Sequence, residues 1–225
     1  MRIARVLEAL DAELLADSRC YFGGGTAISL RYGEYRESRD IDLLVSDGSG
    51  YAELRERLRG PAGFKALTKL PIPTLRPVIA DQYGIRTVLD VDGEPIKFEI
   101  IREARIELQE PDSGDSICGI LTLTALDMAS SKLLANSDRW ADAFMFSRDI
   151  IDLAMMDPGQ ELVNRAIVKA EHAYRSAVVN DLVSAVDYLR DNPHRLDDCM
   201  RELQMHDVPK AFLWDRIKHL LPRIP

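Results

Sequence analysis

The sequence predicts an α/β (α+β) fold in which a small mixed β-sheet with flanking helices is followed by an all-helical C-terminal domain. Strand-like runs and glycine-rich turns are confined to about the first 120 residues. From about residue 122 onward the hydrophobic pattern is helical throughout. We therefore predict two domains, residues 1–121 and residues 122–225.

The first domain is expected to begin with an amphipathic helix over residues 3–15, where leucine, valine and isoleucine share one face. An apolar strand at Cys20–Phe22 runs directly into three glycines, and a helix is expected to start at Thr26. Residues 40–45 form the next strand, and residues 51–59 form a helix.

A β-hairpin is predicted next, with strands at residues 85–91 and 96–101 around the turn Asp92–Pro95. Prolines make residues 70–78 a loop or a sheet edge. The helical half is expected to hold helices from Thr124 to Ala135 and from Arg139 to Met156. Shorter helices follow at residues 160–173, 175–190, 194–204 and 208–220.

Composition excludes several classes of protein. The 225 residues include 37 acidic and 29 basic ones, a net charge of −8 that argues against a nucleic-acid coat protein bound by general charge. No apolar run approaches the roughly 18 residues of a membrane span. Cys20, Cys118 and Cys199 are widely separated, which disfavours a disulfide framework or structural zinc and favours a reducing cytoplasm.

The strongest chemical signal is the pair Asp40 and Asp42. On a strand these carboxylates would share a face about 6.6–6.8 Å apart at Cα, while Ile41 and Leu43 point into a core. A divalent metal is the usual way to neutralise two such carboxylates. A chance occurrence in an acidic chain is the alternative.

Two further features lie near this pair. The glycine turn before Thr26 would let backbone N–H groups at a helix start approach phosphate oxygens, although a tight turn without a ligand is also possible. Glu99 lies in the second hairpin strand with Lys97 on its face. If that strand neighbours the Asp40–Asp42 strand, three carboxylates converge; otherwise Glu99 simply faces solvent.

Four separated blocks resemble AbiEii and MenT-like nucleotidyltransferases, a toxin family of the DNA polymerase β nucleotidyltransferase superfamily. The first two are Gly24-Gly25-Thr26-Ala27 and Arg36-Glu37-Ser38-Arg39-Asp40-Ile41-Asp42-Leu43. The others are Lys132-Leu133-Leu134-Ala135 with Arg139, and Arg148-Asp149-Ile150-Ile151-Asp152-Leu153. They span about residues 22–153. The third acid of this family is more often Asp than Glu, so Glu99 departs from the pattern.

The resemblance implies an Mg²⁺- or Mn²⁺-dependent enzyme that moves a nucleoside monophosphate from a nucleoside triphosphate to an acceptor hydroxyl. The acceptor could be RNA such as tRNA, a protein or a small molecule, and a cognate antitoxin is an expected partner. Asp40, Asp42 and Glu99 would hold the metal ions, with Glu99 also a candidate base. No membrane partner is expected.

The same resemblance assigns nucleotide contacts to Gly24, Gly25, Thr26 and Lys132. Arg39, which forms a local basic cluster with Arg31 and Arg36, is a further candidate nucleotide contact. Asp149 would contact the nucleotide or orient Lys132, unless it forms only a salt bridge between helices. For Asp152 the structural role, a salt bridge between helices, is the favoured interpretation. Arg39 could meet phosphates or merely balance nearby acids. A catalytically inactive nucleotide-binding or partner-binding protein of the same fold is the alternative function.

Overall fold

The computed structural model describes residues 2–222, which form two compact units. The first unit comprises the chain up to Ala27 together with Arg39–Thr124, and the second comprises Ile28–Ser38 and the chain from Ala125 onward. The predicted boundary between residues 121 and 122 stays a prediction. The outer ends of the two predicted domains, residue 1 and residues 223–225, lie outside the described residues. The assignment of Ile28–Ser38 to the helical unit was not expected.

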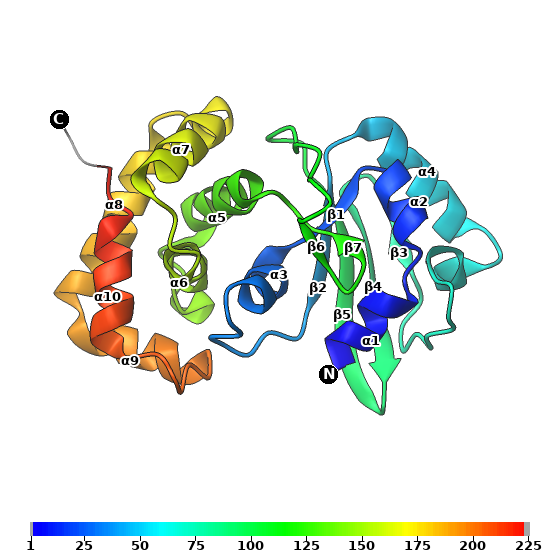
Figure 1. Cartoon of the computed structure of the whole chain (residues 1–225), viewed down its shortest axis with the longest axis horizontal. Coiled ribbons are helices and arrows are strands. Elements are labelled where there is room, and N and C mark those ends of the chain that lie inside the picture. The colour runs from blue at the N-terminus through cyan, green and yellow to red at the C-terminus, as the bar shows by residue number, and fades with distance from the viewer. Residues whose placement is uncertain (1, 223–225) are drawn as a thin grey trace. The chain divides into compact units, whose positions relative to one another are not determined.

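The first unit is built on a mixed five-stranded sheet with the order β1-β2-β5-β4-β3, confirming the predicted fold class (Figure 1). Its central pair, β2 and β5, is parallel, and the other neighbours are antiparallel. The strands are β1 (Cys20–Gly23), β2 (Ile41–Val45), β3 (Ile79–Ala80), β4 (Gly84–Val91) and β5 (Glu94–Arg102). A separate two-stranded sheet pairs β6 (Ser116–Ile117) with β7 (Ile120–Leu121).

One face of the five-stranded sheet forms the core of this unit. Ile41, Leu43 and Val45 of β2 are fully buried, as the alternation predicts. On β5, Phe98 meets Phe64 edge to face with ring centroids 5.0 Å apart. Phe64 belongs to the 3₁₀ helix η1 (Gly63–Leu67), so η1 covers this face and the residues alternating with Phe98 point the other way.

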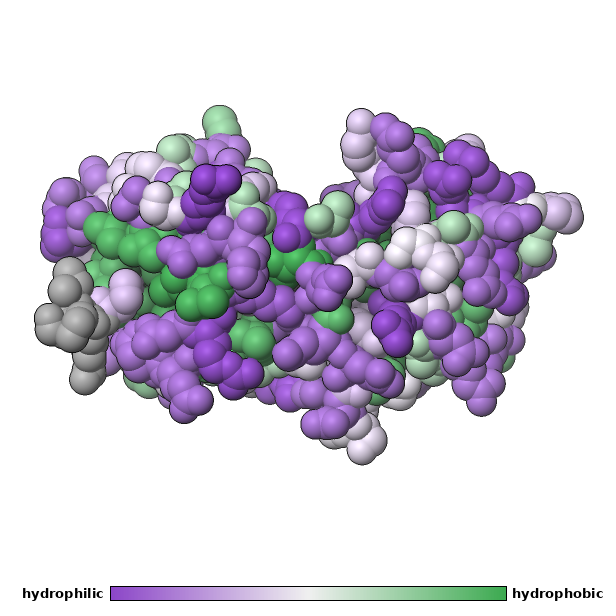
Figure 2. Space-filling view, turned by 90° about the horizontal axis from the view of Figure 1, so that it is seen from above, coloured by the Kyte–Doolittle hydropathy of each residue, from purple (hydrophilic) through white to green (hydrophobic). Residues whose placement is uncertain are grey.

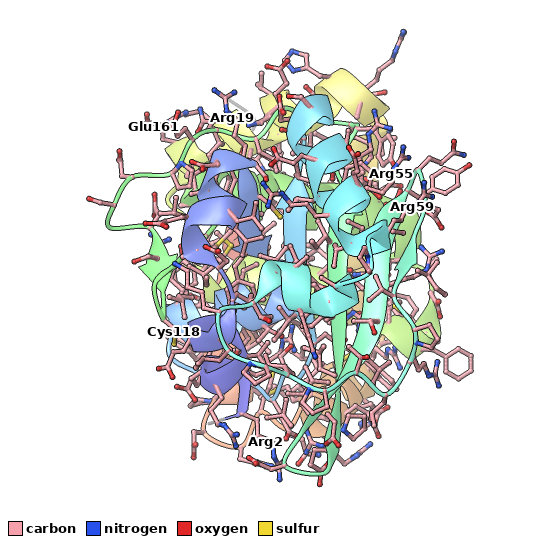
Figure 3. All side chains as sticks on the ribbon, turned by 90° about the vertical axis from the view of Figure 1, so that its right-hand side faces the viewer. Arg2, Arg19, Arg55, Arg59, Cys118 and Glu161 are labelled. Carbon is pink, nitrogen blue, oxygen red and sulfur yellow. The ribbon has the colours of Figure 1, made fainter. Side chains whose placement is uncertain are left out.

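Helix α4 (Gly48–Arg59) packs against β2 and β3. Arg55 and Arg59 extend from the same side of this helix (Figure 3), and Arg59 Nε donates to the Ala80 carbonyl at 3.0 Å. This bond ties the end of α4 to the edge strand β3. Cys118 is exposed in the β6–β7 turn, and all three cysteines are free.

The expected helix over residues 3–15 is wrong, because the structure breaks it into α1 (Arg2–Ala9) and α2 (Ala12–Asp17). Leu10 forms a β-bridge with Thr68 instead of continuing the helix. Asp11 then caps α2 by accepting from the Leu14 N–H at 3.3 Å. The apolar periodicity continues across the break and therefore conceals it.

The second unit is helical from Ala125 onward. Helix α5 (Ala125–Arg139) packs against α6 (Arg148–Met155), α7 (Gln160–Tyr174) and α8 (Ala177–Asp191). Two further helices, α9 (Pro193–Glu202) and α10 (Lys210–His219), complete the unit. The visible face of this unit carries large hydrophobic areas, whereas that of the sheet unit is mainly hydrophilic (Figure 2).

The predicted helix over residues 139–156 is also wrong in its first half. Asp142 caps the short 3₁₀ turn η2 (Ala143–Met145) by accepting from the Phe144 N–H at 2.9 Å. Phe146 and Ser147 then adopt left-handed backbone conformations, which cannot continue a helix. Helix α6 consequently begins only at Arg148.

Candidate functional site

The glycine turn and the acidic strand approach each other closely in the first unit. Helix α3 (Gly24–Arg31) begins directly after β1, and Gly23 pairs with Asp42 across the antiparallel β1–β2 ladder. Gly24 has a φ of +68°, and a Cβ there would lie 2.9 Å from the Asp42 Cβ. Position 24 therefore requires glycine for both conformation and space.

Asp42 and Glu99 are direct neighbours on parallel strands. The register of β2 and β5 pairs their Cα atoms, so both side chains lie on the sheet face opposite Phe98. The strand that carries Glu99 is therefore adjacent to the strand that carries Asp42, as the predicted convergence of these acids requires. Asp40 immediately precedes β2 and so lies just outside the strand predicted for it.

Lys97 lies on the same face as this acidic pair, two residues before Glu99. Its Nζ is 2.7 Å from Glu99 Oε2, and its side chain is half exposed. Burial lowers the pKa of the Lys97 ammonium, but the ion pair with Glu99 and the charges of Asp40 and Asp42 outweigh burial and raise this pKa above its ordinary value. We call Asp40, Asp42, Glu99 and Lys97 the acidic face.

The oxygen donors of the acidic face match the chemistry of Mg²⁺ or Mn²⁺, which prefer carboxylates. Within residues 2–222, no three carboxylate, imidazole or thiolate groups lie close enough together to hold a metal ion as they stand. The three carboxylates thus supply the right ligands but do not already form a closed cage.

The other predicted nucleotide contacts of the chain's first part lie at the start of α3 and directly before Asp40. Gly25 and Thr26 form the first turn of α3, and the Thr26 side chain is buried. Arg39 is exposed next to Asp40. Their contacts with a nucleotide stay predictions.

Lys132 and Asp149 meet in the second unit. Lys132 on α5 is buried, and its Nζ lies 2.9 Å from Asp149 Oδ1 and 2.6 Å from Asp152 Oδ2 on α6. Arg139 Nε donates to Asp149 Oδ2 at 2.6 Å and remains one-third exposed. These ion pairs join α5 to α6.

Asp152 is the centre of this network, and two of its partners come from the segment Ile28–Ser38 of the helical unit. Arg36 donates from Nε at 2.6 Å and from Nη2 at 2.9 Å, and the Tyr35 hydroxyl donates at 2.7 Å. The role of Tyr35 was not foreseen. A tyrosine followed by an arginine just before the Asp40–Asp42 motif was the available signal, but its partner is more than a hundred residues away.

Electrostatics of the network follow from burial and pairing. Burial raises the pKa of Asp152, but the Lys132 and Arg36 charges outweigh it and hold this pKa below its ordinary value. The pKa of Asp149 is also held low, because Lys132 and Arg139 outweigh burial. For Lys132 the two aspartates outweigh burial and raise the pKa. The network therefore holds three cations and two carboxylates that are charged at neutral pH, and the negative charge of Asp138 also acts on Arg139.

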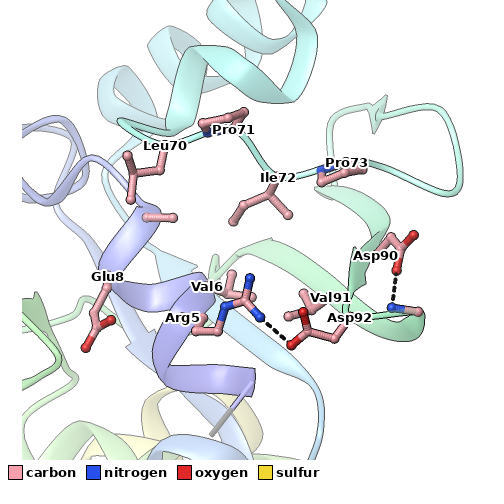
Figure 4. A pocket seen from close by; sticks show the side chains of 12 residues that line it. Arg5, Val6, Glu8, Leu70, Pro71, Ile72, Pro73, Asp90, Val91 and Asp92 are labelled. Atoms are coloured by element: carbon pink, nitrogen blue, oxygen red, sulfur yellow. Dashed lines mark hydrogen bonds and ion pairs between the residues drawn. The ribbon is translucent and has the colours of Figure 1, made fainter.

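The sheet unit also carries a groove of about 570 Å³ away from the acidic face (Figure 4). Arg5 and Val6 of α1 form one wall, the loop Leu70–Pro73 forms another, and the β4–β5 turn closes one end. Arg5 is ion-paired with Asp92 across it. None of the predicted site residues lines this groove.

No helix within residues 2–222 is long and apolar enough to cross a membrane.

A family model described as nucleotidyl transferase AbiEii toxin, type IV toxin–antitoxin system, matches residues 5–214. No curated protein matches the sequence. A candidate nucleotidyltransferase from Helicobacter pylori is similar in structure, with a TM-score of 0.51 and 16% identity over 97% of this chain and 92% of the other.

A second Helicobacter pylori structure, JHP933, matches with a TM-score of 0.48 and 15% identity over 97% of this chain and 89% of the other. At such identities the first likeness demonstrates a shared fold and nothing more. The family match covers nearly the whole chain and agrees with the four motif blocks. The chain therefore belongs to the AbiEii nucleotidyl transferase toxin family of type IV toxin–antitoxin systems.

Proposed function

We propose that this protein transfers a nucleoside monophosphate from a nucleoside triphosphate to an acceptor hydroxyl, using Mg²⁺ or Mn²⁺. Membership of the AbiEii family supports nucleotidyl transfer. The observation that carries the proposal is the register of Asp42 with Glu99, directly beside the close approach of Gly24. A chain that only bound partners would have no need for two neighbouring carboxylates on one sheet face, one of them against the glycine turn.

Asp40, Asp42 and Glu99 are the residues that would hold the metal ions. Their carboxylate oxygens are suitable ligands, and half-exposed Lys97 leaves the face accessible to solvent. When bound, the metal ions would supply charge neutralisation for the triphosphate and a lower pKa for the acceptor hydroxyl.

The remaining work falls to groups of the chain itself. Backbone N–H groups of Gly24 and Gly25 and the hydroxyl of Thr26 orient the β- and γ-phosphates at the start of α3. The acceptor oxygen forms a bond to the α-phosphorus while the bond to the bridging oxygen breaks, and diphosphate leaves. The Glu99 carboxylate accepts the proton of the acceptor hydroxyl. Arg39 adds a further phosphate contact.

The helical unit contributes positive charge in this proposal. Lys132 neutralises the triphosphate, and Asp149 fixes the direction of its ammonium group through the 2.9 Å contact. Arg139, one-third exposed, is the cation of this network that an anionic ligand would reach.

We further propose that the acceptor is a hydroxyl of RNA such as tRNA, of a protein or of a small molecule. A cognate antitoxin would be the partner in a type IV toxin–antitoxin system. The sheet unit would be the catalytic domain and the helical unit an accessory one. Free cysteines and the lack of a membrane-spanning helix among residues 2–222 support a cytoplasmic location.

The test uses the purified full-length chain with each of four α-³²P-labelled nucleoside triphosphates, Mg²⁺ or Mn²⁺, and total cellular RNA or protein extract. We expect label to be transferred with one nucleotide and one acceptor class. Asp42→Asn should reduce transfer by at least about a hundredfold, because removing one metal-facing carboxylate weakens transition-state stabilisation by several kcal/mol.

The matched control is Asp112→Asn, which makes the same chemical change at an exposed position of the sheet unit. This variant should transfer label as the wild type does. Nucleotide binding without transfer in any extract would favour the inactive binding protein. Equal transfer with and without EDTA would refute the metal dependence, and full activity in Asp42→Asn would refute the site.

A further inference from the structure

Lys97 has an unusual position for a surface lysine, because it lies within the face that is proposed to attract divalent cations. Its ammonium group contacts Glu99 at 2.7 Å, and the negative charges of Asp40 and Asp42 are near enough to influence it. An exposed lysine normally gains more from hydration than from such a cluster.

The strand on the other side of Glu99 does not provide a competing cation. Arg86 of β4 is the cross-strand neighbour of Glu99, but its guanidinium pairs with Asp81 at 2.5 Å. The cation that contacts Glu99 is therefore Lys97 of its own strand. The acidic face keeps a charge of −2 when its three carboxylates and Lys97 are all ionised.

We propose that Lys97 is a built-in counter-ion that holds the acidic face together without metal and is displaced when a divalent cation binds. This inference rests on the proposed function only in taking the acidic face as the metal site. Lys97 is thus a positioning residue, which keeps Glu99 aligned with Asp42 before metal binds.

Lys97 and a divalent cation would compete for the same position beside Glu99. An ammonium and a divalent cation cannot both occupy the space beside Glu99, since at such a short distance like charges repel each other even in water. Salt reduces this repulsion. Metal binding must therefore move the flexible lysine side chain away from Glu99, and its half-exposed position allows that movement.

The inference is tested by titrating the full chain with Mn²⁺ and measuring free Mn²⁺ by electron paramagnetic resonance, without nucleotide and at low salt. Lys97→Met retains the apolar stem and removes the charge. We expect Lys97→Met to bind Mn²⁺ about three- to tenfold more tightly than wild type. Without metal, in EDTA, its melting temperature should fall by about 1–3 °C, because the carboxylates lose their counter-ion.

Two controls separate local from general charge effects. Lys97→Arg keeps the positive charge and should bind Mn²⁺ as wild type does. Lys65→Met removes one charge from an exposed position on η1 and should also leave Mn²⁺ affinity unchanged.

The outcomes distinguish the inference from the proposed function. If the wild type binds Mn²⁺ and Lys97→Met binds it equally well or more weakly, the role of Lys97 is overturned while the metal site stands. Failure of both chains to bind Mn²⁺ would overturn the metal site and the inference together. Binding by Lys97→Met alone would support the inference in its strongest form.

Discussion

Asp152→Asn tests whether the network around Asp152 holds the helical unit together. Asp152 is fully buried and accepts hydrogen bonds from Arg36, Tyr35 and Lys132 at 2.6–2.9 Å. Asparagine has nearly the same volume and keeps one acceptor oxygen. The substitution therefore removes one negative charge and leaves two buried cations with a single remaining aspartate, Asp149, in the network.

The expected cost follows from the burial of these ions. Removing one partner of a buried ion pair costs about 3–5 kcal/mol, because the remaining charge is left uncompensated. For a chain of this size, 1 kcal/mol corresponds to about 2–4 °C in melting temperature. We therefore expect Asp152→Asn to melt about 6–20 °C below wild type.

The measurement is thermal unfolding followed by circular dichroism at neutral pH. Asp157→Asn is the matched control, since Asp157 follows the same helix and pairs with Arg216 at 2.9 Å while remaining 68% exposed. A surface pair contributes about 0–1 kcal/mol, so this control should lose less than about 4 °C. If the two variants melted within 2 °C of each other, the network would not be a source of stability.

Two further predictions concern the glycine turn and the loss of stability at low pH. Gly24→Ala should destabilise by about 1–3 kcal/mol more than Gly93→Ala, because both positions have positive φ but only position 24 would crowd Asp42; equal losses in urea unfolding would contradict the close approach. The low pKa values of Asp149 and Asp152 stabilise the fold above the unfolded-state pKa of about 3.9, and this contribution is lost as pH falls below about 4 toward the folded-state values. The free energy of unfolding should consequently drop as the pH is lowered from about 4 to about 2, and less steeply in Asp152→Asn; parallel pH profiles would refute this cause.

Much of the acidic face could be predicted from short-range pattern. Alternation alone oriented Asp42 away from Ile41 and Leu43, and the hairpin around Asp92 and Gly93 was evident from turn chemistry. The pairing of β2 with β5 could not be derived, because strand order depends on packing between segments far apart in the chain. For that reason the sequence alone could not decide whether Glu99 lies beside Asp42 or simply faces solvent.

The errors in the helices have a common physical origin. Hydrophobic periodicity continues through Leu10 and again after Arg139, but the side chains of Asp11 and Asp142 each cap the start of a new helical segment there, so one long helix does not form. A side-chain cap competes locally with helix continuation, and a window of apolar positions does not record that competition.

The role of Lys132 was the hardest to predict. Its proposed contact with triphosphate came from family resemblance, whereas its partners Asp149 and Asp152 depend on how α5 and α6 pack. A substitution of Lys132 will consequently affect stability as well as any activity, because it leaves two buried carboxylates underpaired.

The segment Ile28–Ser38 has a consequence for the order in which the protein can mature. Arg36 leaves the ribosome more than a hundred residues before Asp152, its partner in the helical unit. During synthesis the nascent chain must carry this arginine without its carboxylate until α6 has been made. In a fragment ending at Thr124 the segment Ile28–Ser38 would never meet the helices it packs with, and Arg36 would lack its carboxylate partner. Cleavage after the sheet unit should therefore yield a chaperone-dependent product, not an independent domain.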